Sequence, residues 1–170
     1  LGRKINKHLL NSHGLLNFPN YQMDSVRLGI GLYGSATDVN LTQISSLTSI
    51  IAQIRNIKKG ETVGYGNSFV AKKTMKIAII PVGYADGINR GLSNNVGALF
   101  INKNKCPIIG KISMDSLAVD VTKSDAKEGD LVEIFGNQLH VSEIAKKINT
   151  IPYEIYSTLN RRIKRIYSNL

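Results

Sequence analysis

The sequence predicts a mainly β fold, with a sandwich or barrel-like β domain that follows a shorter α/β region. Between about residues 47 and 135 the chain consists of short runs rich in Ile and Val, separated by turn residues such as Lys59-Gly60. Residues 1 to about 34 show the mixed helix and strand signals of an α/β unit. After residue 135 the apolar residues follow helical spacing. Several short strands spaced in this way are typical of a sandwich or barrel.

The first part of the chain predicts few elements. We expect a strand end at residues 8–12, a short irregular or helical piece at 15–21 and a glycine-punctuated strand at 26–33. A polar stretch at 38–42 indicates a linker.

The second part predicts strands first and helices afterwards. The expected strands are residues 47–57, 63–70, 76–82, 96–101, 108–112, 117–121 and 131–135. Ser142 is expected to cap a helix whose apolar face is formed by Val141, Ile144, Ala145 and Ile148. Pro152 is expected to open a second helix over 153–159, and the alternation at 162–167 predicts a last strand.

Length and composition bound the class of protein. The chain has 170 residues, of which 42% are hydrophobic and 20% charged, as in a globular protein with one domain or one small domain and an appendage. No apolar run approaches the roughly 18–20 residues that cross a bilayer, and the start shows no signal segment. The sequence begins at Leu1 and not at Met, as a piece of a longer protein would. Cys106 is the single cysteine, which excludes an internal disulfide and suits a reducing cytoplasm, and three His with one Cys do not make a closed zinc site.

The net charge of +10 raises the question of an anionic partner. It comes from 22 Lys and Arg against 12 Asp and Glu, spread evenly along the chain except for a cluster at Arg161, Arg162, Lys164 and Arg165. Aromatic residues make up 6% of the chain, and none interleave with this cluster as a stacking platform for nucleic acid requires. A solvated basic face is therefore favoured over a nucleic-acid surface, and no role is assigned to Arg161 or Arg162.

Glycines at residues 29–34 match the letters of a dinucleotide fingerprint but not its context. The glycines fall within a strand-like run, and position 55, where an acidic residue is needed for the ribose, is Arg. Backbone N–H groups at such glycines still suit a phosphate, with Arg27 and Ser12 as natural companions.

Other candidate residues are weak when taken singly. Tyr65 stands between two glycines, and a Tyr base needs a cation or a donor to stabilise its phenolate; an edge-strand aromatic is the alternative. Asp86 and Asp115 sit in loops, where carboxylates usually bond to local backbone.

Taken together and in order, these motifs resemble the alanine racemase family. The matching segments are residues 11–12, 26–34, 59–66, 81–87, 107–115 and 153–154, which include Gly-Tyr-Gly, Gly-Tyr-Ala-Asp-Gly and Ser-Met-Asp. The resemblance implies that residues 1–40 are the C-terminal remnant, with the last strands, of a pyridoxal-phosphate-binding (β/α)8 barrel. Residues 41–170 are then the C-terminal β domain. From about residue 41 we expect this domain to fold by itself, with 1–34 mobile or docked opportunistically.

The resemblance also implies the cofactor residues. Ser12, Gly29, Ile30 and Tyr153 match the positions that hold the cofactor phosphate. Arg27 matches the arginine at the pyridine nitrogen, which a guanidinium cannot protonate because it has no proton to surrender. His13 departs from the small residue usual after the serine.

Catalytic and substrate residues follow from the same resemblance. Tyr65 matches the base for the L-enantiomer, which reaches the site of the partner subunit in a homodimer, and His8 matches a histidine hydrogen-bonded to the arginine and the tyrosine. Met114 and Asp115 match substrate-side residues, with the Met N–H meeting the substrate carboxylate, and Tyr84 matches a tyrosine at the entrance.

The implied activity is the interconversion of L- and D-alanine by two bases on opposite sides of pyridoxal 5′-phosphate. Such a cytoplasmic isomerase supplies D-alanine for cell-wall peptidoglycan, and no metal, nucleic acid or membrane is implied. The motif of the second base, the Schiff-base lysine, is absent, and Lys4 and Lys7 lie in the wrong context to replace it. The alternatives are a racemase for serine, lysine or a broader set, and a non-catalytic basic β domain that binds nucleic acid.

Overall fold

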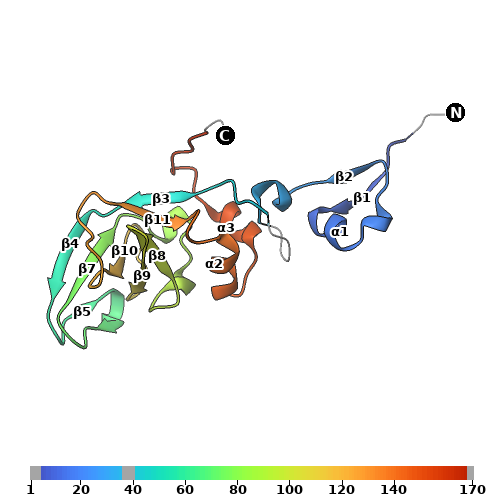
Figure 1. Cartoon of the computed structure of the whole chain (residues 1–170). Coiled ribbons are helices and arrows are strands. Elements are labelled where there is room, and N and C mark those ends of the chain that lie inside the picture. Colours follow the sequence, from blue (N-terminus) through green and yellow to red (C-terminus); the bar gives the residue numbers. More distant parts are fainter. Residues whose placement is uncertain (1–4, 36–40, 168–170) are drawn as a thin grey trace. The chain divides into compact units, whose positions relative to one another are not determined.

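The computed structural model describes residues 5–35 and 41–167, in two compact units that comprise residues 1–45 (unit 1) and 46–170 (unit 2) (Figure 1). Most of the linker predicted at 38–42, and Lys4, lie outside the described residues.

Unit 1 is built around two parallel strands, β1 (His8–Asn11) and β2 (Ser25–Arg27). Two short helices, α1 (Ser12–Asn17) and η1 (Pro19–Tyr21), connect them. The strand runs directly into α1 because the Asn11 side chain caps this helix and accepts a hydrogen bond from Gly14 N at 2.8 Å. The helical option for 15–21 is therefore the correct one.

The strand predicted at 26–33 is wrong beyond Arg27. At Gly29 the backbone leaves the strand conformation, with φ −127° and ψ −96°, and a 3-10 helix, η2 (Ile30–Tyr33), follows. Gly34 ends this helix with φ 69°, and a Cβ there would lie 1.8 Å from the Thr42 carbonyl oxygen, so no other residue fits. The glycines thus form a turn after a strand and are not part of one.

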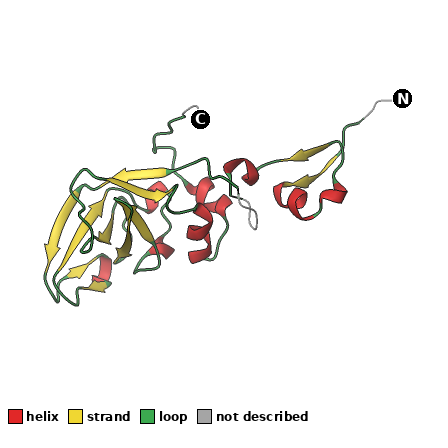
Figure 2. Ribbon diagram, viewed as in Figure 1, coloured by secondary structure: helices red, strands yellow, loops and turns green. Residues whose placement is uncertain are grey.

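Unit 2 contains a curled, seven-stranded sheet in which every pair is antiparallel (Figures 1 and 2). In sheet order the strands are β3 (Leu47–Ile50), β11 (Leu131–Phe135), β8 (Ala98–Ile101), β9 (Asn104–Ile109), β10 (Leu117–Asp120), β7 (Met75–Ile80) and β4 (Gln53–Ile57). This arrangement confirms the mainly β, barrel-like prediction.

The strand predicted at 47–57 is two strands, and the break explains the curl. β3 and β4 lie at opposite edges of the sheet, although only Ile51 and Ala52 separate them. Three peptide steps span at most about 11 Å, so the two edges must come close together. Ile51 N bonds to Asp130 O and Ala52 N to Ile79 O, which ties this corner to strands near both edges.

Apolar side chains alternate between the two faces of the sheet, and both faces bury some of them. In β7, Ala78 and Ile80 point into the main core, while Met75 and Ile77 join a second cluster on the other face. A small hairpin of β5 (Thr62–Val63) and β6 (Phe69–Val70) covers that second cluster with its apolar side chains. The strand predicted at 63–70 is therefore two short strands with a turn between them.

Two helices close the main core. In α2 (Val141–Lys147) the predicted apolar face is buried, but the cap is His140 and not Ser142: His140 Nδ1 accepts from Ser142 N at 3.2 Å. In α3 (Pro152–Thr158) the proline stands in the first turn, as predicted. The strand predicted at 162–167 is absent, and the chain there forms turns and irregular structure.

Candidate active site

The Ser12 hydroxyl organises the glycine turn of unit 1. Its Oγ accepts hydrogen bonds from Gly29 N at 3.0 Å and Gly31 N at 3.2 Å. A hydroxyl has two acceptor positions and one hydrogen, so the Ser12 O–H is left to donate. A Cβ on Gly29 would meet nothing within 4 Å, and the turn is open there. Ser12 is itself buried, so its hydroxyl hydrogen and the open backbone at Gly29 are the groups that this turn offers to a phosphate oxygen.

His8 and Arg27 are in contact, as the resemblance implies. Parallel pairing of β1 and β2 brings them together, with Arg27 Nη1 3.0 Å from His8 Nδ1. A guanidinium carries only donors, so His8 Nδ1 must be the acceptor and the ring hydrogen must sit on Nε2. The predicted bond from His8 to the tyrosine stays a prediction.

Tyr65 projects from the hairpin of unit 2. It begins a 3-10 turn, η3 (Tyr65–Asn67), between β5 and β6, and 67% of its surface is exposed. Val63 and Phe69 flank the turn and pack against the second core cluster, so the hairpin is anchored while the phenol remains accessible.

Two glycines lock this turn onto the segment that leads to Met114. Gly64 has φ 82°, and a Cβ on it would lie 2.7 Å from Lys111 N; Gly110 has φ 68°, and its Cβ would lie 2.7 Å from Val63 O. Ser68 Oγ accepts from Lys111 N at 2.9 Å. Glycine is needed at both positions because backbone packs directly on backbone.

The turn at residues 83–87 is joined to residues 113–115 in the same way. Tyr84 N donates to Ser113 O at 3.1 Å, and Ala85 N donates to Met114 O at 3.0 Å. A Cβ on Gly83 would lie 2.3 Å from both of these carbonyl oxygens. The Met114 N–H, in contrast, donates to no acceptor among the described residues.

Tyr84 and Tyr153 are the other accessible phenols of the predicted site. Tyr84 is 42% exposed, with the Arg90 guanidinium carbon 5.7 Å from its ring centroid. Tyr153 lies in the first turn of α3 and is 39% exposed. A hollow of about 260 Å³ between the Tyr84 turn and α3 is lined by Tyr84, Arg90, Glu154 and Thr158 among others.

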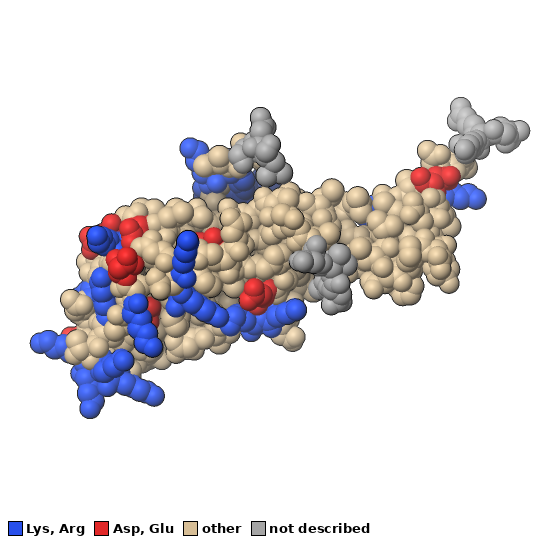
Figure 3. Space-filling model, in the orientation of Figure 1, with Lys and Arg blue, Asp and Glu red and all other residues tan. Residues whose placement is uncertain are grey.

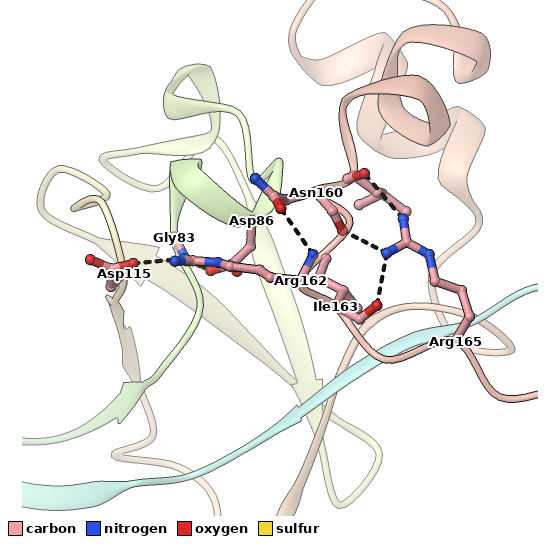
Figure 4. A network of polar contacts seen from close by, with 8 residues as sticks. Gly83, Asp86, Asp115, Asn160, Arg162, Ile163 and Arg165 are labelled. Carbon is pink, nitrogen blue, oxygen red and sulfur yellow. Dashed lines mark hydrogen bonds and ion pairs between the residues drawn. The ribbon is translucent and has the colours of Figure 1, made fainter.

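The structure adds one residue that the sequence analysis missed, Arg162. Its Nε lies 2.6 Å from Asp86 Oδ1, and its Nη2 lies 2.6 Å from Asp115 Oδ1 (Figure 4). The hydrogen bond from Arg162 lowers the pKa of Asp86 against the opposing effect of burial. Asp86 Oδ2 also accepts from Gly83 N at 2.9 Å, so the local-turn interpretation of Asp86 is correct but incomplete.

No sequence signal places Arg162 at this site. It is 76 residues from Asp86 and 47 from Asp115, and it lies in a basic run that by itself indicates a solvated face. In that run Arg165 also bonds to its own chain, through the carbonyls of Leu159, Asn160 and Ile163. Two cations of the densest basic cluster are therefore engaged internally.

The other charged side chains that the structure describes are scattered (Figure 3), and Cys106 is buried. Figure 3 shows Lys and Arg side chains scattered over the visible face of unit 2, with acidic side chains among them. Burial raises the pKa of the Cys106 thiol to about 11, which disfavours the reactive thiolate. Within the described residues no helix combines the length and the apolar content that crossing a bilayer requires.

The predicted site residues are thus divided between the units. Tyr65, Tyr84, Met114 and Asp115 lie on turns of unit 2 that glycine contacts and backbone bonds connect, and Tyr153 is in the same unit. Ser12, Arg27, Gly29, Ile30 and His8 form a second group in unit 1.

Known proteins resemble the chain over nearly its whole length. The "Alanine racemase 2" of Caldanaerobacter subterraneus is 41% identical over 95% of the chain and 44% of the relative, and the alanine racemase of Brucella canis is 38% identical over 96% and 46%. A crystal structure of the alanine racemase from Bartonella henselae, with covalently bound pyridoxal phosphate, matches with a TM-score of 0.90 and 38% identity. The match covers 98% of this chain and 48% of the Bartonella henselae chain.

The chain therefore spans about half the length of the relatives that it matches. Residues 44–167 match the family described as alanine racemase, C-terminal domain. This match takes in the sheet, both closing helices and the turns that carry Tyr65, Tyr84 and Met114. The chain belongs to the alanine racemase family.

Proposed function

We propose that this chain supplies the C-terminal half of an alanine racemase active site and takes part in the interconversion of L- and D-alanine. The observation that carries the proposal is the placing of Tyr65. An exposed phenol stands on a turn that glycine contacts lock to the segment presenting Met114, whose N–H has no acceptor among the described residues. A proton acceptor and a carboxylate donor are thus held on one rigid framework.

The residues of unit 1 fit pyridoxal 5′-phosphate. Ser12 has a hydroxyl hydrogen to donate to a phosphate oxygen, beside Gly29 and Ile30, and Tyr153 of unit 2 completes the proposed phosphate set. Arg27, oriented by His8, is proposed to face the pyridine nitrogen. When bound, this cofactor supplies an electron-withdrawing ring that stabilises negative charge at the α-carbon of alanine.

Racemisation requires that a proton leave one face of the α-carbon and that another arrive on the opposite face. We propose that Tyr65 Oη takes the proton from L-alanine and returns it in the reverse direction. Tyr65 would act in the site of a partner subunit, in a homodimer. The second base would be a lysine of the barrel to which residues 1–40 belong as a C-terminal remnant, with 41–170 as the β domain.

Other residues of unit 2 would hold the substrate. The free Met114 N–H suits the alanine carboxylate, because a backbone donor that is fixed in place needs no reorganisation on binding. Asp115 would lie on the same side, and Tyr84 would restrict the entrance. The proposed product, D-alanine, is used in cell-wall peptidoglycan, and a cytoplasmic site of action accords with a single buried thiol.

The test is hydrogen exchange at the α-carbon of alanine in a fusion of this chain to the N-terminal part of the Bartonella henselae alanine racemase. In D₂O with pyridoxal phosphate, the fusion should place deuterium in both L- and D-alanine. Tyr65→Phe should abolish exchange from L-alanine and retain exchange from D-alanine, where the lysine is the base. Serine and lysine as substrates serve as specificity controls.

Two results would contradict the proposal. Equal loss of exchange from both enantiomers in Tyr65→Phe would show that this tyrosine is not the base for one face. Faster exchange with serine or lysine than with alanine would assign the chain to a different racemase.

A further inference from the structure

Two turns of unit 2 meet at their backbones and each carries a carboxylate. The turn at residues 83–87 carries Tyr84 and Asp86, and the loop at residues 113–115 carries Met114 and Asp115. Two backbone hydrogen bonds join them, from Tyr84 N to Ser113 O and from Ala85 N to Met114 O. Like charges on Asp86 and Asp115 would push the turns apart unless a cation lay between them.

Arg162 provides that cation in a fixed geometry. Its Nε bonds to Asp86 and its Nη2 to Asp115, both at 2.6 Å, so one edge of the planar guanidinium spans the two carboxylates (Figure 4). Lysine has a single ammonium on a flexible stem and does not offer two donors in a plane. Glutamine would remove the charge as well as this edge.

The segment after α3 is built to hold Arg162 in place. Asn160 Oδ1 accepts from Arg162 N at 2.9 Å, and Asn160 N donates to Asp86 O at 3.2 Å. Arg165 closes the same segment through carbonyls of Asn160 and Ile163. Gly87, with φ 101°, lets the 83–87 turn approach the end of α3, since a Cβ there would lie 2.6 Å from Thr158 O.

We infer that Arg162 is a positioning residue that fixes the spacing between the Tyr84 turn and the Met114 loop, and through it the geometry in which the substrate carboxylate is bound. The inference rests on the proposed function, in which the Met114 N–H meets that carboxylate. Arg162 itself touches neither substrate nor cofactor. It acts through the two aspartates.

Kinetics of the fusion protein separate positioning from general stabilisation. In Arg162→Gln the KM for alanine should rise about tenfold, with kcat within about twofold, because the carboxylate donor is displaced while Tyr65 is not. Arg162→Lys should behave like the glutamine variant, because lysine keeps the charge but lacks the two donors that bond to both aspartates. Arg161→Gln, a change at the exposed neighbour, should alter neither constant.

A lower kcat with unchanged KM in Arg162→Gln would indicate loss of folded enzyme and overturn the inference. Full recovery in Arg162→Lys would overturn the role of the guanidinium edge.

Amide exchange of the 170-residue chain tests the spacing without any activity. The Tyr84 and Ala85 amides, which donate to Ser113 O and Met114 O, should exchange at least about tenfold faster in Arg162→Gln than in Arg161→Gln. Ala78 and Val119, in the paired strands β7 and β10, should be unchanged. Unchanged exchange at Tyr84 and Ala85 would overturn the inference. An inactive wild-type fusion would instead count against the proposed function, while the exchange result would still decide the role of Arg162.

Discussion

The two units achieve local order by different means. Unit 2 buries aliphatic side chains on both faces of its sheet, and among the largest fully buried are Phe135, Ile51 and Ile80. In the described part of unit 1, the buried hydrophobic residues are Leu10 and Ile30. The exposed large apolar side chains in this part are Ile5, Leu9, Leu16, Phe18, Tyr21, Met23, Leu28, Leu32, Tyr33 and Ile44.

In unit 1, a network of polar contacts forms with few buried apolar side chains around it. Ser12 bonds to the Gly29 and Gly31 amides, and Arg27 bonds to His8, so the residues proposed to bind the cofactor are tied to one another within unit 1. A pair of parallel strands is normally covered on both faces, so the apolar surface of unit 1 suits burial against the other elements of the barrel proposed above. Unit 2 carries the proposed base and its own core together.

The largest expected effect separates the two units by their chemistry. In the fusion protein, Tyr65→Phe should lower the rate of racemisation about 10²–10⁴-fold and leave the affinity for pyridoxal phosphate unchanged. Ser12→Ala should instead weaken that affinity about tenfold, because a donor to the phosphate is lost. Rates and cofactor titrations of both variants measure the pair of effects. The same loss of cofactor affinity in both variants would contradict the assignment of cofactor binding to unit 1 and of the base to unit 2.

A second prediction concerns the core of unit 2. Phe135 is 2% exposed and meets the Tyr156 ring edge-on, with centroids 5.8 Å apart, so it joins the sheet to α3. Phe135→Ala should lower the free energy of unfolding by about 3–5 kcal/mol in urea titrations of the chain. Leu131, on the same strand, is 63% exposed. Leu131→Ala should change the free energy of unfolding by less than about 0.5 kcal/mol. Equal effects of the two substitutions would contradict the assignment of this core.

Hydrogen exchange of the chain compares the units directly. Amides at residues 26–33 should be at least about a hundredfold less protected than those of β7 and β10, since few buried contacts hold them. Protection of 26–33 should rise in the fusion protein, where the elements of the proposed barrel would cover the strands. Protection in the isolated chain equal to that of the β strands would mean that unit 1 is stable by itself.

The smallest effect is a dependence of unit 2 stability on pH. Arg162 lowers the pKa of Asp86 in the folded chain, so the stabilisation is present above the usual aspartate pKa of about 4 and is lost as pH falls through the folded value. Asp86→Asn should therefore flatten the decline in unfolding free energy below about pH 5. Asp125→Asn, at an exposed position, is the matched control, and Asp130, whose pKa is also lowered, is present in both variants. Identical slopes in the two variants would contradict the role of Asp86.

The local part of this structure could be predicted from the sequence. Short Ile/Val runs between turn residues placed β8, β10 and β11 within two residues at each end, because a buried strand needs only its own apolar residues to be recognised. The sequence does not predict the break at Ile51–Ala52, because the curl of the sheet requires it and no turn residue marks it. The sequence predicts strand through the Tyr65 turn, because the geometry of this turn depends on Gly110, far along the chain.

The site shows the same limit. His8 and Arg27 were placed together by the resemblance, and strand pairing brings them into contact. Arg162 had no such signal, because neither periodicity nor local motif connects an arginine after the last helix to carboxylates 76 and 47 residues before it. Long-range ion pairs of this kind follow only from the three-dimensional arrangement.

The most direct test of the central claim is a measurement of alanine racemisation with added pyridoxal phosphate, by the chain alone and by the fusion protein. Activity in the fusion that is absent from the isolated chain is the expected result, because the proposed second base belongs to the barrel. Racemisation by the 170-residue chain itself would contradict the account, since both bases would then have to lie among its own residues.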